Sequence, residues 1–154
     1  MTGFRLWAPA AVQVELVLGE ERQAMRPEEH GWWSAAAPAT GPEIDYAFAL
    51  DGGPPLPDPR SPRQPRGVHG PSRTVDHAAF RWRDAGWQPP PWEQALVYEL
   101  HIGTFTPGGT FEAAIERLDH LVDLGVTHVE LMPVAAFPGR RGWGYDGVLL
   151  FAPD

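Results

Sequence analysis

Residues 95–132 read ALVYELHIGTFTPGGTFEAAIERLDHLVDLGVTHVELM, and this stretch is the most informative about the fold. It begins with an apolar run, Ala95 to Ile102, that is typical of a buried strand. From Thr110 the apolar residues recur at steps of three and four. This predicts a helix with Thr110 as its N-cap and Gly125 just beyond its end. Residues 127–132 are strand-like again, so the order strand, helix, strand indicates a βαβ unit.

The residues before this unit predict a small β-sandwich. Apolar residues alternate with other types over 4–8, 12–18 and 46–50, which is the period of half-buried strands. The third of these segments ends at the turn signal Asp51-Gly52-Gly53. If Trp32 and Trp33 lie in a strand, one indole points inward and the other outward. An exposed indole could stack on a sugar ring, but closing a small sandwich is the commoner use of such a pair.

Proline-rich segments divide the chain. The sequence has 17 glycines and 18 prolines, with dense groups over 54–71 and 89–91 that exclude a helix or a central strand. We therefore expect a sandwich over residues 1–88, a linker over 89–94 and a second unit over 95–154.

Composition excludes several classes of function. The chain has 154 residues, a net charge of −8, no cysteine, and only arginine among its 12 basic residues. An acidic chain argues against binding to nucleic acid or to an anionic membrane. The missing cysteines and lysines exclude a zinc finger, a thiol nucleophile and a Schiff-base lysine. With no apolar run of 18 residues and no signal-peptide pattern, we expect a soluble, cytoplasmic protein.

Two motifs that suggest cofactor or metal chemistry have simpler explanations. Residues 103–110 mimic the spacing of a phosphate-binding loop, but Gly109 stands where that loop needs its lysine. Four acidic residues follow one stripe of the predicted helix, opposite its apolar face, and are best explained as a solvated surface: Glu112, Glu116, Asp119 and Asp123. The histidine spacing fits no metal site. We expect neither a cofactor nor a metal.

Residues 137–148, FPGRRGWGYDGV, are the best candidate for a binding site. They follow the end of the second predicted parallel strand, which is where α/β sheets and barrels place their sites. Their four glycines allow turns that could bring Trp143, Tyr145 and Asp146 toward one pocket. The alternative is an ordinary long loop.

Several segments together resemble one enzyme family. The opening FRLWAP of residues 4–9 resembles the early-set β-sandwich that precedes the barrel in branching, debranching and trehalohydrolase enzymes. Residues 97–105, VYELHIGTF, and residues 118–133, LDHLVDLGVTHVELMP, resemble the first strand, first helix and second strand of the barrel in glycoside hydrolase family 13, the α-amylase superfamily. Residues 142–148, GWGYDGV, are most similar to the trehalohydrolase branch, because branching enzymes usually have glutamine where this chain has Asp146.

The resemblance implies a fold and a reaction. The fold is an N-terminal all-β early-set (immunoglobulin-like) sandwich followed by the first βαβ part of an incomplete (β/α)8 barrel. The reaction is retaining hydrolysis of the α-1,4 bond next to the terminal trehalose of maltooligosyl trehalose, or of a related α-glucan. By the same resemblance Trp143, Tyr145 and Asp146 belong to the substrate loop.

The catalytic carboxylates of this family come from the fourth, fifth and seventh barrel strands, so none is assigned in this chain. A complete barrel needs about 250 residues, which leads us to expect an N-terminal piece of a larger enzyme. Two alternatives stay open: part of a branching or debranching enzyme, or a non-catalytic glucan-binding module. The sequence says nothing of the oligomeric state.

Overall fold

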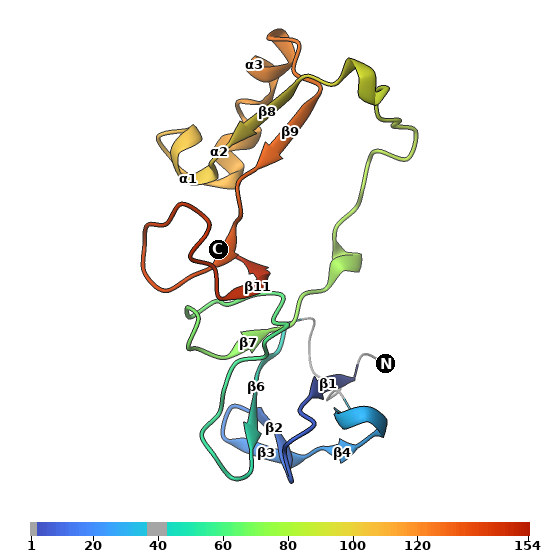
Figure 1. The fold of residues 1–154 in the computed structure, drawn as a ribbon, viewed down its shortest axis with the longest axis vertical. Helices are drawn as coiled ribbons and strands as arrows, with labels where there is room; N and C mark the ends of the chain where they lie inside the picture. The colour runs from blue at the N-terminus through green and yellow to red at the C-terminus, as the bar shows by residue number, and fades with distance from the viewer. Residues whose placement is uncertain (1–2, 37–42) are drawn as a thin grey trace.

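The computed structural model describes residues 3–36 and 43–154, arranged as a lower β unit and an upper unit of strands and helices (Figure 1). The lower unit holds two antiparallel sheets. The first sheet has the order β1 (Phe4–Trp7), β5 (Trp32–Ala35) and β4 (Arg26–Pro27). The second has the order β3 (Glu21–Ala24), β2 (Val14–Leu18), β6 (Asp45–Leu50) and β7 (Ser72–Arg73).

The first sheet follows the predicted alternation. Phe4 and Leu6 are buried whereas Trp7 is exposed. Leu6 lies opposite Trp33, whose indole packs on the core and donates from Nε1 to the Ala8 carbonyl at 3.1 Å. Trp32 lies opposite Trp7, with a guanidinium 4.8 Å from its ring centroid. One tryptophan therefore faces inward and its neighbour outward, as expected.

The second sheet differs from the prediction at its first strand. Val12, expected inside a strand, is exposed, because β2 begins only at Val14. The Oδ1 atom of Asp51 accepts hydrogen bonds from the backbone N–H groups of Val12 and Gln13, at 2.8 and 2.9 Å. Asp51 and Gly52 have φ angles of 52° and 76°, which suits the predicted Asp-Gly turn. The turn thus holds the residues before β2 outside the sheet.

One hydrophobic core lies between the two sheets, which makes the lower unit a β-sandwich. It combines residues of both layers: Phe4, Leu6, Ala8, Val14, Leu16, Met25, Tyr46 and Phe48. The Tyr46 hydroxyl donates to Asp58 Oδ2 at 2.8 Å inside this region. Burial, together with the neighbouring Asp58 carboxylate, raises the pKa of Tyr46 well above its usual range.

The proline-rich segment packs on the sandwich. Ser61 and Ser72 are completely buried, and the Asp58 backbone N–H donates to the Ser72 hydroxyl at 2.9 Å. Val68 is buried with Ala136, Leu149 and Ala152 of the C-terminal hairpin. Beyond β7, residues 74–94 are mostly exposed and carry two short 3-10 helices, at His77–Ala79 and Trp92–Gln94.

The upper unit contains two parallel strands joined by helices. Strands β8 (Val97–Leu100) and β9 (His128–Leu131) pair with Val97 opposite His128. The connection holds α1 (Ile102–Phe105), α2 (Phe111–Ile115) and α3 (Leu118–Asp123), which gather beside β8 (Figure 1).

The predicted helix limits are confirmed, but the helix is divided. The Thr110 hydroxyl accepts from the Ala113 N–H at 3.2 Å, and Gly125 has a φ of 81°. Between α2 and α3, Arg117 leaves helical geometry with φ −105° and ψ 1°. The expected strand over Ala95–Ile102 was too long, because Ile102 already begins α1.

Burial in the upper unit is lower than the apolar pattern predicts. In β8 only Leu100 is buried, and of the expected apolar helix face Ile115 and Val122 are more than 60% exposed. The expectation of a buried strand was therefore wrong for β8 in this chain. Parallel strands are normally covered on both faces, whereas a sheet of two strands and short helices gives its apolar side chains few partners.

A hairpin ends the described chain. Strand β10 (Ala135–Ala136) pairs antiparallel with β11 (Leu149–Pro153), and residues 137–148 form the loop between them. The hairpin lies between the upper unit and the sandwich (Figure 1). Among the described residues, no helix is long and apolar enough to cross a membrane.

Candidate functional site

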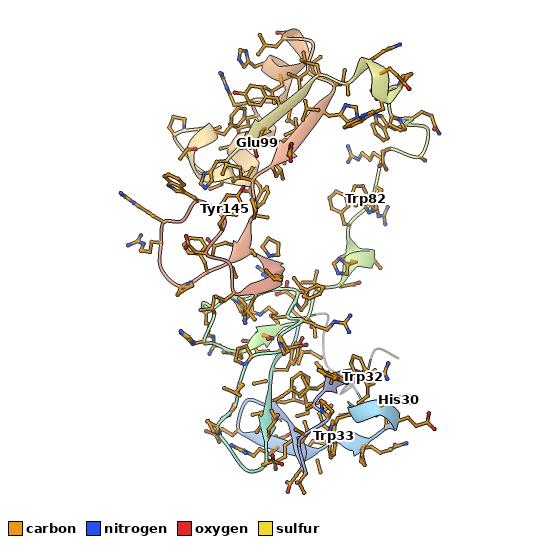
Figure 2. All side chains as sticks on the ribbon, viewed as in Figure 1. His30, Trp32, Trp33, Trp82, Glu99 and Tyr145 are labelled. Atoms are coloured by element: carbon orange, nitrogen blue, oxygen red, sulfur yellow. The ribbon has the colours of Figure 1, made fainter. Side chains whose placement is uncertain are left out.

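The loop of residues 137–148 lies beyond the carboxyl end of β9, as predicted. Trp143 and Tyr145 are 80% and 71% exposed, and Asp146 is exposed as well. Figure 2 shows Tyr145 on this loop near the upper unit. Within the part of the chain that the structure describes, no hydrogen bond or ring contact joins the three side chains to one another. They share one loop but do not form a closed pocket.

Two glycines allow the backbone of this loop to lie close to the residues after β9. A Cβ at Gly144, which has a φ of 92°, would lie 2.1 Å from the Pro133 carbonyl oxygen. A Cβ at Gly147 would lie 2.6 Å from the Cβ of Ala135. Both approaches are too short for any side chain. These close approaches therefore require glycine at both positions, and the side chains between them are exposed.

A third attachment comes from the end of β8. The imidazole Nε2 of His101 lies 2.9 Å from the Gly142 carbonyl oxygen, and because a carbonyl can only accept, Nε2 carries the proton. On the other side of Gly142, a Cβ would lie 3.1 Å from the Phe137 ring. Sequence reasoning missed His101. Its position at the end of the first parallel strand, at the same sheet edge as the loop, was the available signal.

A shallow hollow adjoins the loop through the same histidine. It is lined by residues of β8 and α1: Tyr98, Glu99, Leu100, His101, Thr104 and Phe105. Glu99 lies in register with Glu130 of the neighbouring strand, so two carboxylates stand side by side on the sheet. The chemistry available here is an open surface with aromatic rings, carboxylates and one hydrogen-bonded imidazole.

The other sequence motifs lie away from the loop. Gly103 belongs to α1, so residues 103–110 combine a helical turn with a loop rather than forming one open cradle. The acidic stripe over Glu112, Glu116, Asp119 and Asp123 is exposed, as expected for a solvated helix face.

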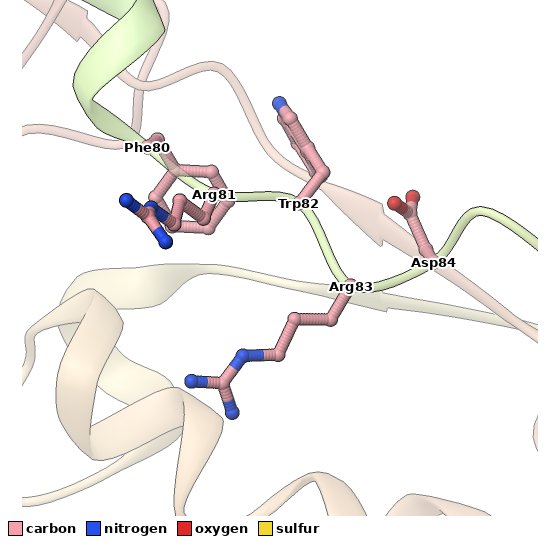
Figure 3. A pocket seen from close by; sticks show the side chains of 5 residues that line it. All are labelled: Phe80, Arg81, Trp82, Arg83 and Asp84. Carbon is pink, nitrogen blue, oxygen red and sulfur yellow. The ribbon is translucent and has the colours of Figure 1, made fainter.

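A second hollow runs along the connecting segment and is lined by Phe80, Arg81, Trp82, Arg83 and Asp84 (Figure 3). Phe80 and Trp82 meet edge to face, with ring centroids 4.9 Å apart. All five residues belong to one exposed stretch of chain. Because consecutive residues of one extended segment form the whole lining, this hollow brings no distant groups together and supports no site.

The chain is similar in sequence to several known proteins. Residues 1–60 match the family carbohydrate-binding module 48 (isoamylase N-terminal domain). The malto-oligosyltrehalose trehalohydrolase of Rhizobium sp. is 53% identical over 97% of this chain and 26% of its own length. The 1,4-alpha-glucan branching enzyme of Vibrio cholerae is 36% identical over 97% of this chain and 24% of its own length.

A solved structure agrees with these relatives. The crystal structure of a putative alpha amylase from Salmonella typhimurium superposes with a TM-score of 0.93 at 50% identity, over 98% of this chain and 26% of that one. The chain is thus similar to malto-oligosyltrehalose trehalohydrolases over nearly all of its residues, and it spans about a quarter of the length of these relatives.

Proposed function

We propose that this chain is the N-terminal part of a malto-oligosyltrehalose trehalohydrolase, in which residues 95–154 open a (β/α)8 barrel and the sandwich precedes it. The single observation that supports this most is the 53% identity over 97% of the chain. The parallel pairing of β8 with β9 across a helical connection suits the start of such a barrel. The domain limits 1–88, 89–94 and 95–154 and a cytoplasmic location stay predictions.

The proposed reaction is hydrolysis of the α-1,4 bond next to the terminal trehalose of maltooligosyl trehalose. Trp143, Tyr145 and Asp146 are proposed to bind the sugar rings beside that bond. An indole or phenol ring offers a flat apolar face to the C–H face of a pyranose, and a carboxylate accepts hydrogen bonds from sugar hydroxyls. Their exposure beside Gly144 and Gly147 supports this role.

The experiment is a product analysis on the protein extended to the length of its trehalohydrolase relatives. With maltooligosyl trehalose as substrate, we expect release of trehalose and a shortened maltooligosaccharide. Transfer of glucan chains without trehalose release would favour the branching-enzyme alternative, which the 36% identical relative keeps open. Binding of maltoheptaose without any turnover would favour the glucan-binding module instead, as the match over residues 1–60 allows.

A further inference from the structure

His101 is the side chain that links the end of the first parallel strand to the loop of residues 137–148. Among the described residues, its bond to the Gly142 carbonyl is the side-chain hydrogen bond that connects residues 95–131 with the loop of residues 137–148. The two partners are 41 residues apart in sequence. Gly142 directly precedes Trp143, so the bond acts at the start of the segment that carries Trp143, Tyr145 and Asp146.

The surroundings of His101 define one orientation of its ring. Thr104 Oγ1 lies 3.4 Å from Nδ1, at the limit of a hydrogen bond, so the hydroxyl faces the nitrogen that does not hold the loop. A Cβ at Gly103 would lie 2.9 Å from the ring atom Cε1, so this glycine leaves the space that the imidazole occupies. The Gly142 carbonyl can only accept, so this contact requires the ring nitrogen that faces the loop to carry a proton.

The loop backbone meets the rest of the chain at three glycines, through one hydrogen bond and two close approaches. Gly142 is bonded to His101, Gly144 lies against Pro133, and Gly147 lies against Ala135. The proposed sugar-binding residues are the ones between these attachments. The last two attachments come from residues that follow β9, whereas the first comes from β8. Without His101, one end of the segment would be free to move away from the barrel strands.

We propose that His101 is a positioning residue: its Nε2–H holds the Gly142 carbonyl and so fixes the Trp143–Asp146 segment over the ends of β8 and β9 for a glucan ring. This inference rests on the proposed function for the identity of the ligand. The positioning itself is a property of this chain and can be measured without substrate.

The first test uses trypsin on the full chain. Arg140 and Arg141 lie in the loop, and Arg81 and Arg83 in the exposed connecting segment provide an internal reference for cleavage rate. Replacing His101→Phe keeps a ring but removes the donor, and His101→Gln restores an N–H at similar reach. His128→Phe is the matched control, because His128 begins the neighbouring strand and bonds to Thr127.

We expect His101→Phe to raise loop cleavage relative to the reference by about fivefold, the factor that one ordinary hydrogen bond is worth. His101→Gln and His128→Phe should stay within about twofold of the parent chain. An unchanged ratio in His101→Phe, or cleavage of His101→Gln as fast as that of His101→Phe, would overturn the proposal.

The second test measures trehalose release by the protein extended to the length of its relatives. His101→Phe should lower kcat/KM about tenfold because the proposed sugar-binding residues of the loop are misplaced. His101→Gln should recover most of the loss. If the parent protein releases no trehalose, the proposed function fails while the trypsin result still decides the positioning role. If the parent is active and His101→Phe matches it, the inference fails.

Discussion

At the scale of single residues, Tyr145 is the side chain whose removal should affect turnover most directly. It is exposed between Gly144 and Gly147, whose backbones lie close to the residues after β9. Under the proposed function, Tyr145→Ala should lower kcat/KM for maltooligosyl trehalose about 10²-fold, because the sugar ring loses its orienting surface. Tyr145→Phe keeps that surface and should stay within about threefold.

Trp82→Ala is the matched control for Tyr145→Ala. Its indole is 76% exposed, but it lies on the connecting segment rather than on the loop (Figure 2). We expect it to leave kcat/KM unchanged. A loss smaller than threefold in Tyr145→Ala, with the fold intact, would reduce Tyr145 to a structural role.

Gly144 and Gly139 provide a second residue-scale comparison, because both have positive φ angles but only one is crowded. A Cβ at Gly144 would lie 2.1 Å from the Pro133 carbonyl oxygen, whereas a Cβ at Gly139 meets nothing within 4 Å. Gly139→Ala therefore carries only the cost of placing a side chain in a sparsely populated backbone region, about 1–3 kcal/mol. Gly144→Ala must also displace the chain after β9. Hydrogen exchange at Ala136 and Leu149 should accelerate clearly more in Gly144→Ala; equal acceleration would show that the crowding is relieved easily.

At the scale of elements, the periodicity of apolar residues predicted whether a segment is a strand or a helix better than it predicted where the segment begins and ends. The strands at Phe4–Trp7 and Asp45–Leu50 were predicted, because one face of each packs on the core. Strand β3 was missed because all four of its residues, Glu21–Ala24, are exposed, so no alternation of apolar residues marks it. The break between α2 and α3 was missed because the apolar steps continue across Arg117, whose backbone alone leaves helical geometry.

The candidate site was also predictable only in part. The position of the loop after β9 could be predicted because the ends of parallel strands meet at one edge. The attachments of Gly142 and Gly144 could not, because they depend on distances between His101, Pro133 and the loop that only the folded chain defines.

The pairing of β6 with β7 predicts a pH dependence of stability. Asp45 accepts hydrogen bonds from Arg73, from Nη2 at 3.0 Å and from Nε, and these bonds lower the pKa of Asp45. Because the folded pKa lies below the unfolded one, the contribution is complete above about pH 4, the ordinary range of aspartate. It is lost as pH falls through the lower, folded value.

Asp45→Asn should therefore lose stability at pH 7 and show a weaker decrease between pH 5 and pH 2 than the parent chain. The effect is at most about 1 kcal/mol, since the pair is partly exposed. Urea unfolding at several pH values measures it. Glu15→Gln, which removes the 2.9 Å ion pair with Arg22 on β3, is the control. An acid decrease as steep in Asp45→Asn as in the parent would contradict the assignment.

At the scale of the whole molecule, the two units should differ in local stability. The sandwich encloses a core built from both of its sheets, whereas Val97, Ile115 and Val122 of the upper unit are exposed. Local opening free energy follows the density of buried contacts. We expect stronger hydrogen-exchange protection over residues 4–35 and 45–50 than over residues 95–132. The opposite order would show that the upper unit is stable by itself.

The difference between the sandwich and the upper unit can also be tested by comparing the aggregation of a shortened chain with that of the full chain. Ending the chain at Gln88 removes the exposed apolar residues of β8, β9 and the helices, together with the free edges of a two-stranded sheet. Such edges favour association with other chains. The shortened chain should remain monomeric at concentrations where the full chain aggregates, as light scattering would show. Equal aggregation of both would place the cause in the sandwich.

The carboxylates of this chain are arranged in a way that predicts no hydrolysis by the chain alone. Retaining hydrolysis needs two carboxyl groups roughly 5–5.5 Å apart on opposite sides of one glycosidic bond. Glu99 and Glu130 are neighbours in register, but they stand side by side on one sheet, and Asp146 is exposed on a separate loop. Two carboxyl groups on the same side of a bond cannot act together as the acid that protonates the leaving group and the nucleophile that attacks the sugar.

Removing one member of a cooperating catalytic set already costs several orders of magnitude in rate. Purified chain incubated with maltooligosyl trehalose should accordingly release no trehalose above a buffer blank, in contrast to the protein extended to the length of its relatives. Asp146→Asn and Glu130→Gln should give the same blank-level signal. Turnover by the chain alone that disappears in either variant would assign a catalytic carboxylate to residues 95–154. The expectation, drawn from the family resemblance, that the catalytic carboxylates come from later barrel strands would then be wrong.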